Sequence, residues 1–140
     1  MAQYYVFGPR MNTNQHELRT PADEIIQRVI GAAYEVANVL GAGFLEKVYE
    51  RALLRELGLR GISAAAQIPL PVCYKGHPVG AYAPDLLVER QLIVELKCVD
   101  CFSNEHMAQC LNYLRASGLK FALLINFQHP KIEWKRMIWG

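Results

Sequence analysis

The fold is decided by one apolar stretch near the middle of the chain, which reads Leu92-Ile93-Val94-Glu95-Leu96-Lys97-Cys98-Val99. Its aliphatic and β-branched residues predict a strand that is buried within a sheet. The stretch nevertheless contains a carboxylate and an ammonium group. Because side chains alternate between the faces of a strand, Glu95 and Lys97 project from the same face, roughly 7 Å apart. Burying either charge alone costs several kcal/mol, so the pattern predicts a structural ion pair or a functional site at a strand end.

A second apolar strand, which also contains an acid, precedes this stretch. It reads Ala83-Pro84-Asp85-Leu86-Leu87-Val88, and a tight turn near Glu89-Arg90 is expected to join it to the first. The predicted strands cover residues 85–88 and 92–99, so Asp85 lies across the hairpin from Val94 or Glu95. Two converging carboxylates repel each other unless a cation lies between them, and Mg²⁺ takes oxygen ligands of this kind. Lys97 would stand beside the metal and hold a water molecule or a developing negative charge.

Helices are predicted on both sides of the hairpin. Thr20-Pro21-Ala22-Asp23 is a typical helix start, and apolar residues at helical spacing follow it as far as Gly41-Ala42-Gly43. A second helix is expected over residues 44–57. A third is expected to run to residue 117 behind a capping Ser103, with Gly118 closing it.

The remaining extended segments complete an α/β pattern. Prolines in the first of them indicate an edge strand, and the continuous apolar run of the third indicates a strand buried on both faces. These segments are residues 68–74, 79–82, 121–125 and 132–138. The predicted fold class is a mixed central β-sheet flanked by helices, in the order αα-βββ-α-ββ. We expect a single domain over residues 20–140, preceded by a flexible N-terminal arm over residues 1–19.

The composition is that of a globular protein of one domain. The chain has 140 residues, of which 52% are hydrophobic and 20% are charged, and this apolar content excludes intrinsic disorder. No apolar run reaches the ~20 residues of a membrane span, and no signal peptide opens the chain, so a cytoplasmic protein is expected. The net charge of +2 does not by itself indicate a nucleic-acid-binding protein, although a local groove can still be basic.

The cysteines offer an alternative site. Cys98-Val99-Asp100-Cys101 has metal or redox spacing, and Cys110 follows. A zinc site would ordinarily use two paired clusters, and without a secretory signal reduced thiols are expected. Metal or redox chemistry at these cysteines is therefore the minor interpretation.

Three polar residues on the predicted helices are further candidates. Glu46 borders the apolar stripe of the second helix, where a solvated glutamate is the ordinary interpretation. Gln109 and Tyr113 are four residues apart and share one face of the third helix. Alone, that face is typical of a solvated helix surface.

Three motifs together resemble a known nuclease family. Pro84-Asp85 followed by Glu95-Leu96-Lys97 resembles the PD-(D/E)XK signature of the restriction-endonuclease-like phosphodiesterase superfamily. Gly43-Phe44-Leu45-Glu46-Lys47-Val48-Tyr49 resembles the motif of the GxxExxY family within it. Gln109-Cys110-Leu111-Asn112-Tyr113 resembles the Gln-x-x-x-Tyr element of the lambda-exonuclease and RecB-like branch. The similarity runs from about Pro21 to Trp139, with the motifs in order and on the expected elements.

The resemblance implies a restriction-endonuclease-like core with a metal site at its active edge. By analogy, Asp85, Glu95 and the main-chain carbonyl of Leu96 would ligate Mg²⁺ or Mn²⁺. Glu46 would support a metal ion or its water. The reaction would be metal-assisted hydrolysis of a phosphodiester.

The same resemblance assigns the remaining roles. Lys97 would position the attacking water, while Gln109 and Tyr113 would orient the lysine and the strand backbone. The implied partner is nucleic acid, DNA rather than RNA. Independently of the resemblance, Trp134 and Trp139 are expected at a sheet end or a homodimer contact. The alternative function is a catalytically silent module of the same fold that binds nucleic acid or a protein partner. The weak net charge favours that module, whereas three converging acids, which repel phosphate, favour the nuclease.

Overall fold

The structure, a computed structural model, describes residues 4–7 and 21–140. Within these residues a six-stranded mixed sheet has the order β1-β8-β7-β6-β5-β2. Its central pair β6–β7 is parallel, and the other neighbouring strands are antiparallel. The strands are β1 (Tyr4–Phe7), β2 (Ala64–Ala66), β5 (Leu86–Val88), β6 (Leu92–Lys97), β7 (Phe121–Asn126) and β8 (Glu133–Trp139). This arrangement confirms the predicted α/β class.

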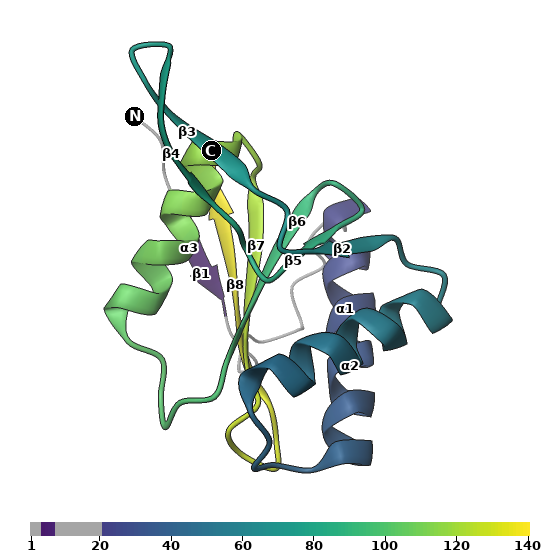
Figure 1. The fold of residues 1–140 in the computed structure, drawn as a ribbon. Coiled ribbons are helices and arrows are strands. Elements are labelled where there is room, and N and C mark those ends of the chain that lie inside the picture. The colour runs from purple at the N-terminus through teal and green to yellow at the C-terminus, as the bar shows by residue number, and fades with distance from the viewer. Residues whose placement is uncertain (1–3, 8–20) are drawn as a thin grey trace.

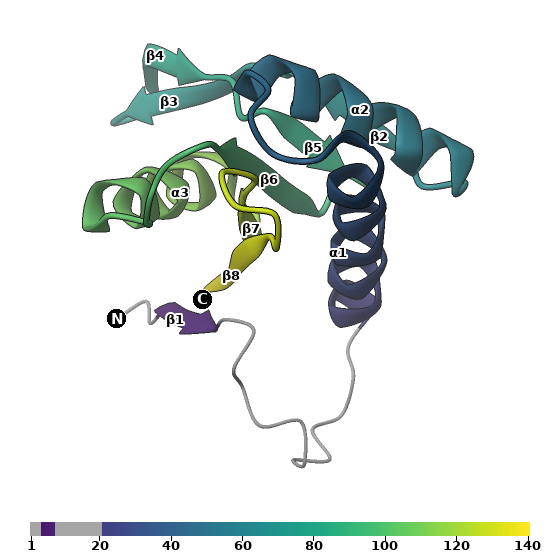
Figure 2. The same cartoon turned by 90° about the horizontal axis from the view of Figure 1, so that it is seen from below.

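Helices cover both faces of the sheet (Figure 1, Figure 2). Helices α1 (Pro21–Leu40) and α2 (Glu46–Leu59) pack on one face, and α3 (Asn104–Ser117) packs on the other. Strand alternation divides the core accordingly, because Val94 and Leu96 join the α1/α2 side while Ile93 joins the α3 side. None of the described helices is both long and apolar enough to cross a membrane.

The predicted helices form, with small shifts at their ends. Helix α3 begins as expected, because the Ser103 hydroxyl accepts the N–H of His106 while the His106 ring accepts the N–H of Ser103. Gly118 closes it at a φ of 74°. Helix α2 begins two residues later than predicted, since Leu45, its N-cap residue, has extended backbone with a ψ of 151°.

The predicted edge strand over residues 68–74 is extended from Leu70, but it does not lie at the edge of the main sheet. Strand β3 (Leu70–Tyr74) pairs with β4 (His77–Tyr82) in a separate two-stranded sheet. The main sheet ends instead at β2, three alanines that pair with β5. Alanine has little strand propensity, and for this reason the sequence pattern does not reveal β2.

The N-terminal arm falls mostly outside the described residues. Within it, Tyr4–Phe7 form β1 and pair with the C-terminal end of β8. The two tryptophans of β8 pack on opposite faces: Trp134 packs against the α1/α2 side of the core and Trp139 against the α3 side.

Candidate active site

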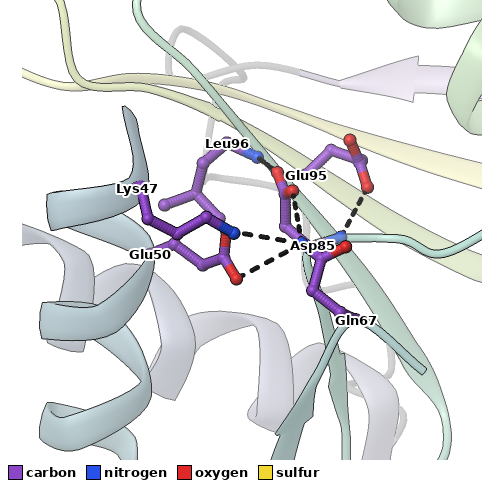
Figure 3. A network of polar contacts seen from close by, with 6 residues as sticks. All are labelled: Lys47, Glu50, Gln67, Asp85, Glu95 and Leu96. Carbon is purple, nitrogen blue, oxygen red and sulfur yellow. Dashed lines mark hydrogen bonds and ion pairs between the residues drawn. The ribbon is translucent and has the colours of Figure 1, made fainter. Parts of the chain in front are cut away.

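Two acids face each other at the open end of the β5–β6 hairpin. The turn at Glu89 and Arg90 has left-handed backbone, with φ of 52° and 56°, and sets Leu86 opposite Val94. The next pair outward is therefore Asp85 and Glu95, within the predicted register. The Asp85 N–H donates to Glu95 Oε1 at 2.8 Å, and the Leu96 N–H donates to Asp85 Oδ2 at 2.8 Å (Figure 3). The opposite strand thus fixes each carboxylate through one oxygen and leaves its other oxygen clear of these main-chain bonds.

Lys97 and helix α3 form the second side of the site. Lys97 follows Glu95 by two residues on the same face of β6, and its ammonium lies 3.4 Å from Gln109 Oε1. Tyr113, one turn further along α3, is buried, and its ring packs edge-on against Tyr82 at 4.9 Å. Burial and the nearby Glu95 raise the pKa of the Tyr113 phenol, so it stays protonated.

Tyr49 holds the start of helix α2 beside these strands. Its hydroxyl donates to the Gly41 carbonyl at 2.6 Å and accepts the Phe44 N–H at 3.2 Å. Its ring stacks on Phe127 at 4.7 Å, directly after the end of β7. These contacts place Glu46, an exposed residue in the first turn of α2, within electrostatic reach of Lys97 and Asp85.

Two further residues belong to the site and were not predicted from the sequence, Glu50 and Gln67. Glu50 lies one turn after Glu46, is only 5% exposed, and pairs with Lys47 at 2.9 Å. The Gln67 side-chain nitrogen lies 3.3 Å from Glu50 Oε1 and 3.3 Å from Asp85 Oδ1, so one amide joins the two acids (Figure 3). A signal for Glu50 exists, because it falls on the apolar stripe of α2 between Tyr49 and Leu53. The sequence offers no comparable signal for Gln67.

Nearby cations do not offset the burial and mutual repulsion of the acids in this site, so their pKa values are raised. Burial first, and then repulsion from Asp85, raises the pKa of Glu95 from 4.5 to about 8. Burial also raises the pKa of Asp85, with repulsion from Glu50 added and the Leu96 N–H opposing. Partial burial of its carboxyl group raises the pKa of Glu46, although Lys97 opposes the shift. A cation at the hairpin end would relieve all three shifts.

The residues of the hairpin fit a hard divalent cation. In the part of the chain that the structure describes, no three His, Cys, Asp or Glu side chains already form a metal-binding group. Mg²⁺ does not need one, because it commonly uses one or two carboxylates together with substrate phosphate and water. Asp85 and Glu95 offer such a pair, with hard oxygen donors held in place by the main chain.

The cysteines fit a metal less well. All four are free thiols. Burial raises the pKa of the Cys110 thiol to about 12, and burial with repulsion from Glu46 raises the pKa of Cys98. Metal ligation requires the thiolate, which these surroundings disfavour.

Comparison with known proteins places the chain in one superfamily. No curated protein and no solved structure matches the chain. The family model described as the PD-(D/E)XK nuclease superfamily matches residues 23–137, which include the β5–β6 hairpin and all three described helices almost completely. The chain therefore belongs to the PD-(D/E)XK nuclease superfamily.

Proposed function

We propose that the protein is a Mg²⁺- or Mn²⁺-dependent nuclease that hydrolyses DNA. Superfamily membership supports the nuclease and the divalent metal. The observation that carries the proposal is the pair of acids at the hairpin end, each bonded to the main chain of the other strand, with Lys97 on the same face. Such placement of a buried acid, Glu95, against a partly buried one, Asp85, is costly for a merely structural pair.

The proposed metal ligands are Asp85, Glu95 and the main-chain carbonyl of Leu96, with Glu46 supporting the ion or its water. When bound, the ion would act as a Lewis acid and lower the pKa of a bound water. Glu50 is not a proposed metal ligand. The Gln67 amide contacts both the Glu50 and the Asp85 carboxylates. We infer that Gln67 and Glu50 are positioning residues for Asp85.

Lys97 would position the attacking water and stabilise negative charge that develops on the phosphate. Gln109 would hold the Lys97 ammonium, in keeping with their 3.4 Å contact. Tyr113 would orient the strand backbone as a neutral phenol, consistent with its raised pKa and its burial beside Tyr82.

We also place the chain in the GxxExxY family, near the lambda-exonuclease and RecB-like branch. The contacts of Tyr49 support this proposal, because they give the tyrosine of the motif a physical reason to accompany Glu46. The four free cysteines suit a reducing compartment, and we propose that the protein acts in the cytoplasm.

The test is a cleavage assay on single- and double-stranded DNA with Mg²⁺, with Mn²⁺ and with chelator. Wild type should cleave only with metal. Glu95→Gln keeps an acceptor for the Asp85 N–H but removes the charge. It should lower cleavage by more than about a hundredfold, beyond the usual effect of losing an outer partner of a metal ligand.

Glu105→Gln is the matched control, because Glu105 is an exposed acid in the first turn of α3. It should cleave like wild type. Full activity of Glu95→Gln would contradict the proposed site. DNA binding without cleavage under any metal would favour the silent module instead.

A further inference from the structure

A hairpin arm stands apart from the main sheet, and its outer part is unusually exposed. We define the arm as residues 68–84, which contain β3 and β4 (Figure 1). Every residue of β4 is exposed, and the outer part carries large side chains in water: Tyr74 is 63% exposed and Val79 is 60% exposed. A two-stranded hairpin is marginally stable by itself in water, so large side chains there indicate a surface that a ligand covers.

The base of the arm is fixed to the candidate active site. The Gln67 N–H donates to the Asp85 carbonyl at 3.1 Å, and the Gln67 side chain contacts the Asp85 carboxylate. Between these two residues, Tyr82 packs on Tyr113 of α3. At about 3.3 Å per residue, the eight residue steps from Asp85 back to His77 span up to about 26 Å. That length corresponds to roughly eight nucleotide steps of a DNA strand.

The charge of the arm suits a polyanion. No Asp or Glu occurs between Glu56 and Asp85, although the chain contains 13 such residues. The turn at the tip carries Lys75, whose ammonium lies 5.4 Å from the centre of the Tyr74 ring, and His77 follows it. An exposed aromatic ring beside a cation is a typical arrangement for contacting bases and phosphates of nucleic acid.

The candidate active site has little attraction for DNA in the absence of metal, because its acids outnumber its cations. Glu46, Glu50, Asp85 and Glu95 are gathered there, with Lys47 and Lys97 beside them. Affinity for a polymeric substrate must therefore come from contacts beyond the scissile phosphate. The arm ends directly before Asp85 and contains no acid of its own.

We propose that the β3–β4 arm is a DNA-binding element that holds the substrate strand outside the cleavage site. Tyr74 stacks on a base and Lys75 contacts a phosphate. The proposal rests on the proposed nuclease function, because it assigns the arm to the same substrate. A protein partner or a second copy of the chain on this surface is a competing outcome of the test.

The experiment separates binding by the arm from chemistry at the site. The arm variants are Tyr74→Ala, Lys75→Asn and the pair together. Asn suits position 75, because its backbone is left-handed at a φ of 48°. Arg90→Asn is the matched control: Arg90 is also an exposed cation in left-handed backbone at a hairpin turn, but in β5–β6.

Three measurements are made on each variant. The first is the Kd for a fluorescent DNA oligonucleotide, measured by anisotropy in the Glu95→Gln background. The second is cleavage of the same DNA, and the third is hydrolysis of bis(p-nitrophenyl) phosphate, which is too small to reach the arm. The double arm variant should bind DNA about tenfold more weakly. The slope of its log affinity against log salt concentration should fall by about one, which corresponds to one lost phosphate contact. Hydrolysis of the small phosphodiester should be unchanged.

Other results overturn the proposal. DNA affinity equal to wild type excludes the arm as a DNA-binding element. If affinity is unchanged but the arm variants alter the oligomeric state, the surface binds a second copy instead. Equal losses on DNA and on the small phosphodiester show that the arm acts only through the site. If wild type cleaves neither substrate, the proposed nuclease function fails, whereas the binding measurement still tests the arm.

Discussion

Two hairpins follow each other in this chain, with similar turns and opposite surroundings. The β3–β4 hairpin turns at Lys75 and Gly76, and the β5–β6 hairpin turns at Glu89 and Arg90, all four in left-handed backbone. Strand β6 is buried from Leu92 to Leu96, whereas every residue of β4 is exposed. The same turn geometry therefore forms both hairpins, and the packing of neighbouring elements determines whether the strands are buried or exposed.

Under the two proposals, the β5–β6 hairpin carries the chemistry and the β3–β4 hairpin contacts the substrate. Strand β6 pairs with the buried strand β7, and the hydrogen bond from the Asp85 N–H to Glu95 holds the two acids together, as the proposed metal site requires. The β3–β4 hairpin is held mainly near its base, where Leu70 and Tyr82 pack on the α3 side. Gln67 joins the two hairpins, since it precedes β3 and contacts Asp85 before β5.

The largest expected contrast is in amide hydrogen exchange. Amides of β6 should open only with global unfolding, because β5 and β7 pair with both of its edges. Amides of β4 should exchange at least about a thousandfold faster through local opening, since global stabilities are typically 5–15 kcal/mol. Exchange measured by NMR checks the contrast, and equal protection of the two strands would contradict it.

The buried hairpin should also make stability depend on pH. The folded protein holds a proton on Glu95 up to about pH 8, whereas the unfolded chain releases it near 4.5. Between these values the folded state binds more protons, so the metal-free protein should lose stability as pH rises. Since one pKa unit corresponds to about 1.4 kcal/mol, the loss should reach a few kcal/mol.

Melting temperatures at several pH values measure this loss. Glu95→Gln should flatten the dependence, because its amide does not titrate. A melting temperature that rises from pH 5 to pH 8 in the metal-free wild type would contradict the raised pKa of Glu95.

The junction between the hairpins should contribute a smaller effect. Gln67 has a φ of 55°, and Gln67→Asn suits that backbone while its amide is one methylene shorter. The variant should lower metal affinity by about tenfold, because Asp85 loses a supporting partner. Isothermal titration with Mn²⁺ measures this affinity. Gln91→Asn, an exposed glutamine after the β5–β6 turn, is the control and should bind like wild type.

The smallest effect concerns the turns. Arg90→Gly relieves left-handed backbone in the buried hairpin and should stabilise the fold by about 0.5–1 kcal/mol. The melting temperature should rise by about 2–4 °C. Lys75→Gly makes the same change in the exposed hairpin, whose local opening does not limit global unfolding, and should leave the melting temperature unchanged. Equal shifts in both variants would show that the two hairpins unfold as one unit.

Much of the fold was predictable from local signals. The capping Ser103, the closing Gly118 and the apolar runs of β6 and β7 depend on neighbouring residues, and the structure confirms them. Strand β2 was not predictable, because three alanines become a strand only by pairing with β5. The separate β3–β4 sheet was missed for the same reason, since pairing partners are a property of the whole chain.

The candidate site divides in the same way. Asp85 lies opposite Glu95 because of the two-residue turn and the alternation of side chains along the strands, and both are local features of the sequence. The joining of Glu50 to Asp85 by Gln67 depends on where α2 and the end of β2 meet the hairpin. No spacing in the sequence encodes that meeting, and the catalytic roles of all these residues stay predictions.

The stacking of Tyr49 on Phe127 has a consequence for the order of assembly during synthesis. Asp85 and Glu95 are ten residues apart and can meet as soon as their hairpin leaves the ribosome. Tyr49 cannot stack on Phe127 until the whole of β7 has been made, because Phe127 follows that strand. Only then is α2 held so that Glu46 lies beside the two hairpin acids. Since chains emerge from the N-terminus, a nascent or truncated chain carries the hairpin acids without their helix. Competence to cut DNA would therefore arise only when nearly the entire polypeptide has been made.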